Sequence, residues 1–291
     1  MTASTVAVPR PSPAPRLPGH RHFLMCPPTH FAVTYAINPW MDPTAPVDPA
    51  RAMEQWQALR RTYVALGHSV EVIPALPGLP DMVFAANGGV VVGGRALSSR
   101  FRYTERAGEE AAYHDWFAAN GVETVRPAHV CEGEGDILTV GRHLLVGSGF
   151  RSDPDVLAEV DEVLAQPSGL TVVPLELVDP RFYHLDTALG ILDDHTAAYL
   201  PSAFSPASAG VLGELFTDLI ASSEADAEVL GLNIVSDGRH VVLEAAATGL
   251  HAELRDRGFV PIGSDMSELR KAGGAVKCCT LELRGLADDP C

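Results

Sequence analysis

The chain has 291 residues, of which 46% are hydrophobic, and it carries a formal net charge of −16 at pH 7. The length is sufficient for a large core, and the negative charge argues against nucleic-acid binding, because phosphates require a basic footprint. No apolar run approaches the roughly 18 residues of a membrane helix, so we expect no membrane association.

Residues 1–20 are rich in proline and lack the apolar stretch of a secretory signal, so we expect a disordered tail followed by a single catalytic domain at residues 21–291. The five cysteines form neither a disulfide-scaffold spacing nor a C-x-x-C pair. This usage predicts a reducing cytoplasm and no structural zinc site.

Strands and helices alternate from residue 22 onward. In chain order we expect a strand at 22–26, a helix at 48–66, a strand at 69–73, a hairpin at 82–99, a helix at 105–119 and a strand at 122–125. The same order then returns three times. The second repeat has a hairpin at 136–146, a helix at 155–166 and a strand at 170–175, and the third has a hairpin at 185–200 and a helix at 205–222. The fourth has a hairpin at 232–243, a helix at 246–257 and a strand at 259–262. A last strand at 275–283 is expected to be completed by the N-terminal strand.

A polar residue marks the start of each repeat. These residues are Asn87, Asp136, Asp186, Asn233 and Cys278, at intervals of 49, 50, 47 and 45. A period of about 50 residues is typical of propellers and solenoids, and a helix in each unit makes the class α/β. We therefore predict an α/β propeller in which these residues converge on the axis; the alternative is a plain doubly wound sheet.

Two adjacent cysteines lie in the last predicted strand. Strand alternation places Cys279 with Leu281 and Leu283 on an apolar face and Cys278 on the mixed face. Cys278 is then the candidate nucleophile, whereas the plainer interpretation is that both thiols are small buried hydrophobes.

The converging residues have a chemical logic. A thiolate at Cys278 needs a base or a positive charge nearby, and His184 can supply it, protonate a leaving amine and then activate water. Asp186 is placed to contact substrate and Glu132 to orient the histidine. The excess of carboxylates favours a cationic ligand such as a guanidinium, which carries five donors and no acceptor.

Four motifs carry a resemblance to a known family. They are Asp81–Asn87 (DMVFAAN), Glu132–Asp136 (EGEGD), His184–Asp186 (HLD) and Gly273–Cys278 (GGAVKC). Together they resemble the guanidine-modifying, or pentein, superfamily, which includes dimethylarginine dimethylaminohydrolases, arginine deiminases and arginine dihydrolases. The resemblance implies a five-bladed α/β propeller, no cofactor or metal, and hydrolysis of arginine or a methylated arginine through a covalent cysteine intermediate.

The resemblance also implies roles for single residues. Cys278 is similar to the family nucleophile, His184 to the general acid and base, and Glu132 to the glutamate that supports that histidine. Arg151, and more loosely Arg100, are similar to arginines that hold the substrate carboxylate. The full set of expected substrate-binding residues is Asn38, Asp81, Asn87, Arg100, Arg151, Asp186, Asn233 and Ala272, the last through its carbonyl.

The sequence departs from the dimethylarginine hydrolases at Ala86 and Asn87, where those enzymes carry acidic residues. With Asn38, Asn87 looks more like the arginine dihydrolase branch, so the end product stays open between citrulline and ornithine. Amidino transfer to an amine and non-catalytic binding of arginine or the ribosome are further alternatives. The oligomeric state is open, a homodimer being one option.

Overall fold

The structure is a computed structural model that describes residues 16–286. Most of the predicted tail, residues 1–15, lies outside the described residues. The remainder runs along the surface, where Arg16 Nε donates to the carbonyl of Arg257 at 3.1 Å and Gly19 N donates to the carbonyl of Asp237 at 2.7 Å.

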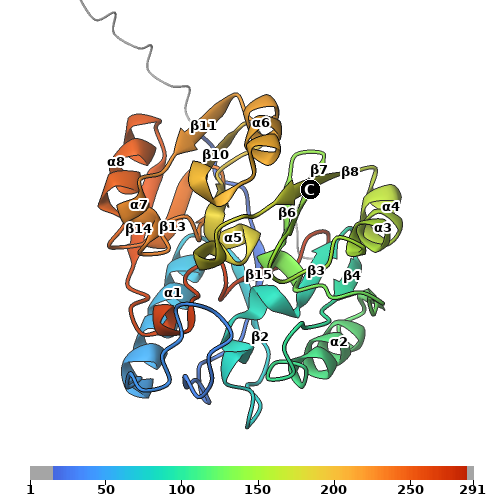
Figure 1. Ribbon diagram of the computed structural model, residues 1–291. Coiled ribbons are helices and arrows are strands. Elements are labelled where there is room, and N and C mark those ends of the chain that lie inside the picture. Colours follow the sequence, from blue (N-terminus) through green and yellow to red (C-terminus); the bar gives the residue numbers. More distant parts are fainter. Residues whose placement is uncertain (1–15, 287–291) are drawn as a thin grey trace, which may run out of the picture.

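Five three-stranded sheets surround one axis, with most of the helices at the rim and the short α5 (Leu185–Ala188) near the centre (Figure 1). In each sheet an inner strand pairs antiparallel with a middle strand, which pairs parallel with an outer strand. The prediction of a five-bladed α/β propeller is confirmed. The blades are β3 (Gly89–Val92), β4 (Arg95–Ser98) and β5 (Glu123–Val125); β6 (Ile137–Val140), β7 (His143–Ser148) and β8 (Thr171–Glu176); β9 (Leu189–Ile191), β10 (Thr196–Tyr199) and β11 (Asp218–Ala221); β12 (Val235–Ser236), β13 (His240–Glu244) and β14 (Val260–Ser264); and β15 (Leu281–Glu282), β1 (His22–Met25) and β2 (Ser69–Val72).

The ring is closed by the two ends of the chain, as predicted. β1 pairs with β15 through Phe23 opposite Glu282 and Leu24 opposite Leu281. A bridge between Val91 and Leu283 then joins this blade to the first one. Closure removes the open edge that a five-unit repeat would otherwise expose.

Helices cover the outer surface of the blades and bury the apolar core between helix and sheet. α1 (Pro49–Ala65) begins after Asp48, whose side chain accepts a hydrogen bond from Arg51 N at 3.0 Å, and it ends before Gly67, which adopts a φ of 89°. The other helices are α2 (Glu109–Ala119), α3 (Val156–Val160), α4 (Gln166–Ser168), α5 (Leu185–Ala188), α6 (Pro206–Leu215), α7 (Glu224–Ala227) and α8 (Thr248–Asp256). No helix in this part of the chain has both the length and the apolar character needed to cross a bilayer.

Two predicted elements are wrong. The helix expected at 205–222 ends at Leu215, because the following residues form β11, which pairs parallel with β10 and completes the sheet. The strand expected at 275–283 is reduced to β15, and residues 276–279 form a turn in which Thr280 N donates to the carbonyl of Lys277 at 2.8 Å. Strand alternation therefore does not separate Cys278 from Cys279, and both are buried.

Candidate active site

The residues that precede the five inner strands meet at one end of the axis. Each is hydrogen-bonded to a residue of the next blade, so that the bonds form a closed ring. The bonds run from Asn87 Nδ2 to Glu132 O (3.0 Å), from Leu185 N to Asp136 Oδ1 (3.1 Å), from Asn233 Nδ2 to Asp186 O (3.0 Å), from Cys278 N to Asn233 Oδ1 (3.0 Å) and from Ala86 N to Cys278 O (3.0 Å). The repeat period thus brings one thiol and several acids to a single place.

Glu132 is fully buried and holds the imidazole. Its Oε2 lies 2.8 Å from His184 Nε2 and 2.8 Å from Arg151 Nη1, and its Oε1 accepts from Arg102 N at 3.1 Å. Burial alone would raise the pKa of Glu132, but Arg151 and His184 outweigh it and lower the pKa well below its usual range. The ionised carboxylate therefore fixes the orientation of the His184 ring.

Cys278 lies between a carboxylate and an amide. Its Sγ is 3.2 Å from Asp186 Oδ2 and 3.2 Å from Asn233 Nδ2, and only 2% of the residue is exposed. Burial, and then the charge of Asp186, raise the pKa of the Cys278 thiol well above its usual value. Burial also raises the pKa of Asp186 to about 6. The Cys278 thiol is therefore neutral at pH 7 in the free protein.

The buried carboxylate of Asp186 predicts a pH-dependent stability. Its folded-state pKa of about 6 lies above the ordinary 3.8, so its favourable contribution is complete below pH 4 and is lost as the pH rises through 6. Asp186→Asn should therefore be more stable than the wild type at pH 8, by about 3 kcal/mol at 1.36 kcal/mol per pKa unit, and this gain should vanish at pH 4. Urea unfolding at both pH values measures it, with exposed Asp256→Asn as the control. An equal difference at the two pH values would contradict this assignment.

The glycines of the EGEGD motif let neighbouring blades approach closely. A Cβ on Gly135 would lie 2.3 Å from Asn87 Nδ2 and 3.1 Å from His184 Cγ, and a Cβ on Gly133 would lie 2.5 Å from the carbonyl oxygen of Ala86. Gly133 also adopts a φ of 61°. The motif is therefore more than an acidic turn, because it makes room for the imidazole and the amide.

Gly135→Ala should displace His184 and Asn87 and lower kcat by about 10²-fold, because small misplacements of reacting groups are costly. We expect a stability loss of about 1–3 kcal/mol from the overpacking. The matched control is Gly210→Ala in α6, where a new Cβ meets nothing within 4 Å; it should keep full kcat. Equal kcat values for the two variants in a steady-state assay would refute the packing argument.

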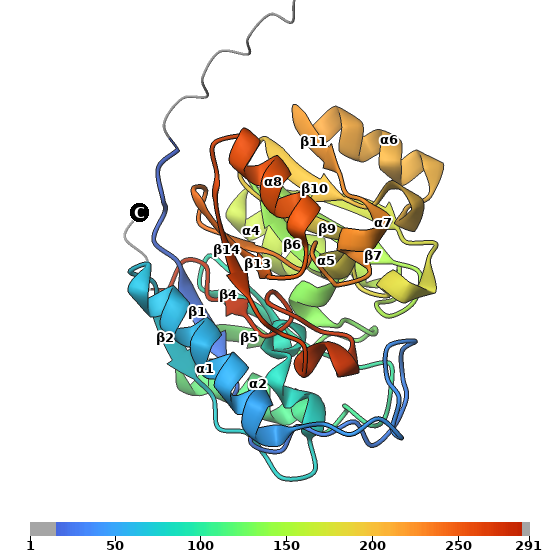
Figure 2. The ribbon, with the colours of Figure 1, turned by 90° about the vertical axis from the view of Figure 1, so that its left-hand side faces the viewer.

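A segment between β1 and α1 covers the site. Arg151 Nη2 donates to the carbonyl of Ile37 at 3.0 Å, and Asn38 Nδ2 donates to the carbonyl of Ala272 at 3.0 Å. Figure 2 shows this blue segment on the same side of the molecule as the short red helix at Leu269–Ala272. Tyr183 closes the site from another direction, with its hydroxyl donating to the carbonyl of Gly273 at 2.8 Å.

Arg100 is not brought into the cluster. Its guanidinium donates to the carbonyl of Ala128 at 2.5 Å, outside the ring of hydrogen bonds. Arg106, which we did not predict, occupies the buried position instead: its Nη1 donates to Asn87 Oδ1 at 2.8 Å and its Nη2 pairs with Glu109 at 2.8 Å. An Arg and a Glu three residues apart usually form an exposed pair, so the sequence carries no signal for this burial.

Asp81 lies beside Arg106, whose Nη2 donates to the backbone carbonyl of Asp81. Its Oδ2 accepts from Tyr35 at 2.9 Å, and within residues 16–286 its Oδ1 is buried without a hydrogen-bond partner, as is Asp186 Oδ1. Buried acceptors of this kind suit a ligand that is rich in donors. No group of three or more metal-binding side chains occurs in the described part of the chain.

No family model matches the chain. It is 56% identical over 284 residues to N(G),N(G)-dimethylarginine dimethylaminohydrolase of Mycobacterium tuberculosis, covering 97% of this chain and 93% of that protein. It is 38% identical over 269 residues, 90% of its length, to a bifunctional arginine dihydrolase/ornithine cyclodeaminase of Nostoc, of which it spans 37%.

Solved structures agree with these relatives. The substrate-bound N-terminal domain of an arginine dihydrolase from the ornithine-ammonia cycle in cyanobacteria superposes with a TM-score of 0.86 at 35% identity, covering 91% of this chain and 98% of that one. The dimethylarginine hydrolase of Pseudomonas aeruginosa with citrulline gives 0.77 at 20% identity, covering 91% and 99% of the two chains, and shows the shared fold. The chain belongs to the family of dimethylarginine dimethylaminohydrolases and arginine dihydrolases, within the pentein superfamily.

Proposed function

We propose that this protein is a dimethylargininase-type hydrolase that converts N-methylated arginine to citrulline and a methylamine, with Cys278 as the nucleophile. The observation that carries the proposal is the contact of the Cys278 thiol with Asp186 and Asn233, at the same end of the axis as the His184–Glu132 pair. The identity to the Mycobacterium tuberculosis enzyme over nearly the whole chain supports the substrate class.

Substrate binding activates the thiol. A guanidinium beside Asp186 brings a positive charge to the buried sulfur, which lowers the pKa of Cys278 in the complex. The Oδ1 atoms of Asp81 and Asp186, which have no partner among residues 16–286, accept the N–H groups of the guanidinium. The free enzyme is thereby protected from reactions with neutral electrophiles.

The reaction proceeds in two displacements. The Cys278 thiol gives its proton to His184, and the resulting thiolate forms a C–S bond to the guanidinium carbon. The bond to the methylated nitrogen breaks as His184 passes that proton to the departing amine. His184 then takes a proton from a water, whose oxygen attacks the same carbon. The C–S bond breaks, His184 returns the proton to the sulfur, and citrulline leaves.

The amino-acid end of the substrate binds away from the sulfur. Arg151, stacked 4.6 Å from the ring centroid of Tyr183, supplies a buried cation for the α-carboxylate. The carbonyl of Ala272 accepts from the α-ammonium once it is released from Asn38. The segment that carries Asn38 must therefore move for substrate to enter.

Arginine dihydrolase activity, giving ornithine, carbon dioxide and ammonia, is the second candidate. Asn87 favours it, since its amide is held by Glu132 and Arg106 where dimethylarginine hydrolases carry an acid. The substrate-bound dihydrolase domain also superposes with a higher TM-score, 0.86, than the Pseudomonas aeruginosa dimethylarginine hydrolase, 0.77. Amidino transfer and simple arginine binding have no comparable support.

Product analysis separates the candidates. Purified protein is incubated with asymmetric dimethylarginine and, separately, with L-arginine, and citrulline, dimethylamine, ornithine and ammonia are quantified. Equal amounts of citrulline and dimethylamine are the expected result. Ornithine with two ammonia per arginine would establish the dihydrolase, and no product from either substrate would overturn both.

The four cysteines within residues 16–286 are all free. This usage supports our proposal that the enzyme acts in the cytoplasm on a small guanidino substrate.

A further inference from the structure

A second cavity, of about 210 Å³, lies at the other end of the propeller axis. It is lined by the last residues of three inner strands, Val140, Ile191 and Ser236, whereas the active-site residues precede the first residues of the same strands. At about 3.3 Å per residue, a four-residue strand such as β6 separates the two ends by roughly 13 Å. On this scale one water needs about 10–15 Å³, so the cavity has room for a small organic molecule.

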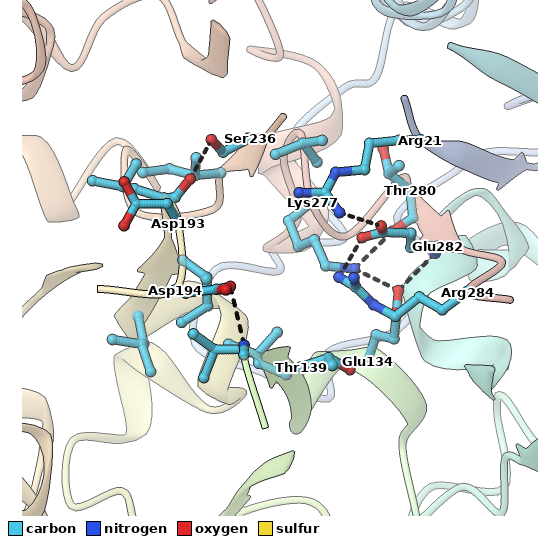
Figure 3. A pocket seen from close by; sticks show the side chains of 18 of the residues that line it. Arg21, Glu134, Thr139, Asp193, Asp194, Ser236, Lys277, Thr280, Glu282 and Arg284 are labelled. Carbon is cyan, nitrogen blue, oxygen red and sulfur yellow. Dashed lines mark hydrogen bonds and ion pairs between the residues drawn. The ribbon is translucent and has the colours of Figure 1, made fainter. Parts of the chain in front are cut away.

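One wall of the cavity is cationic (Figure 3). Arg21 Nη1 lies 3.3 Å from Glu282 Oε1, and Arg284 pairs with the other oxygen of the same carboxylate. Lys277 Nζ lies 2.7 Å from Glu134 Oε2. Three cations therefore share two carboxylates, which leaves a surplus positive charge at this wall.

Three hydrogen-bonding atoms of the lining residues have no partner. Within residues 16–286, these buried atoms are Arg21 Nε, Arg284 Nε and Thr139 Oγ1. A buried donor or acceptor that is left without a partner destabilises the fold. Two guanidinium N–H donors and a hydroxyl are thus left without a partner among the lining residues, and a carboxylate is the small organic oxyanion that guanidinium groups bind well.

The opposite wall is acidic. Asp193 is paired with Arg16, while Asp194 uses Oδ1 to accept from Gly141 N at 3.2 Å and lies exposed at the rim. Figure 3 shows Asp193 and Asp194 on the opposite side of the cavity from Arg21, Lys277 and Arg284. Between the two walls the lining is apolar, with Leu138, Leu189, Leu192 and Ile234 among its residues.

We propose that this cavity binds a small zwitterion of the amino-acid class with an apolar side chain. In this proposal the ligand carboxylate binds Arg21, Arg284 and Thr139. Its ammonium pairs with Asp194, and its side chain packs against the apolar lining residues. The site is separate from the catalytic one, although Lys277, which lines the cavity, directly precedes Cys278.

Calorimetric titration of the full-length protein with L-leucine tests the proposal. Acetate and n-butylamine, each carrying one of the two charges, and inorganic phosphate serve as comparison ligands. We expect saturable leucine binding that is at least about tenfold weaker in Arg284→Met and in Asp194→Asn. Asp194→Asn should leave acetate binding unchanged, and Cys278→Ala should leave leucine binding unchanged.

Arg126→Met, at an exposed ion pair with Asp115, is the matched control and should bind leucine normally. Thr139→Val is a second cavity variant if Arg284→Met does not fold. The proposal is overturned if leucine fails to bind at about 10 mM, a level that detects even millimolar affinity, or if the cavity variants bind like the control. The proposal would also be overturned if Cys278→Ala lost leucine binding. The same holds if phosphate bound in a way that depends on Arg284 while leucine did not bind. Because the readout is binding, failure here is distinguishable from failure of the catalytic proposal.

Discussion

Cys278→Ala will lower kcat for dimethylarginine by about 10⁴-fold or more, because a covalent route ends when its nucleophile is removed. The substitution removes the sulfur that contacts Asp186 and Asn233 and leaves the backbone bonds of the ring in place. We therefore expect a folded protein that still binds substrate. Steady-state citrulline formation and circular dichroism measure the two properties.

Cys279 provides the matched control, because it is the same residue type, one position away and equally buried. It packs in the core and makes no polar side-chain contact within the described residues. Cys279→Ala should keep kcat within about threefold while costing about 1–2 kcal/mol of stability through the small cavity it leaves. Equal activity losses in the two variants would show that packing, rather than nucleophilic attack, explains the effect.

Glu132→Gln has the second largest expected effect, and it acts on both stability and catalysis. The substitution removes a buried negative charge from Arg151 and His184, and breaking a buried ion pair costs about 3–5 kcal/mol. The loss of the carboxylate that orients His184 should lower kcat by about 10²–10⁴-fold, because the proton transfers of His184 depend on its position. Because folding lowers the pKa of Glu132, the carboxylate stabilises the fold above the ordinary pKa of a glutamate, and this stabilisation is lost as the pH falls.

The chain offers a surface version of the same pair for comparison. His129 Nδ1 lies 2.7 Å from Glu159 Oε1, and the His129 side chain is 46% exposed. Glu159→Gln should cost less than about 1 kcal/mol and leave kcat unchanged. Urea unfolding of both variants at pH 7 measures the difference, and comparable losses would contradict the role assigned to burial at Glu132.

The repeat was readable because its signal is periodic. Asn87, Asp136, Asp186, Asn233 and Cys278 recur at nearly constant spacing, and in the structure these residues hydrogen-bond across neighbouring blades. A ring converts constant spacing into proximity, so the fold and the meeting of the polar residues could both be predicted. The same pattern exists in any closed repeat, whatever its local secondary structure.

What could not be predicted depends on contacts between segments distant in sequence. Arg106 is buried through Asn87 and Glu109, and its own segment reads as an ordinary helix start. Residues 218–221 became a strand because β10 offered a partner, although their sequence also fits a helix. The second cavity draws Arg21, Thr139 and Arg284 from three places with no common period.

The central claim is that Cys278 is the covalent nucleophile toward a guanidinium-type carbon. Labelling with 2-chloroacetamidine, an amidinium-bearing alkylator, tests it most directly when peptide mass spectrometry and citrulline formation are followed together. The account predicts that one label enters at Cys278, that activity falls in proportion, and that dimethylarginine slows both processes. Full labelling of Cys278 with turnover intact, or loss of activity that follows a different cysteine, would contradict it.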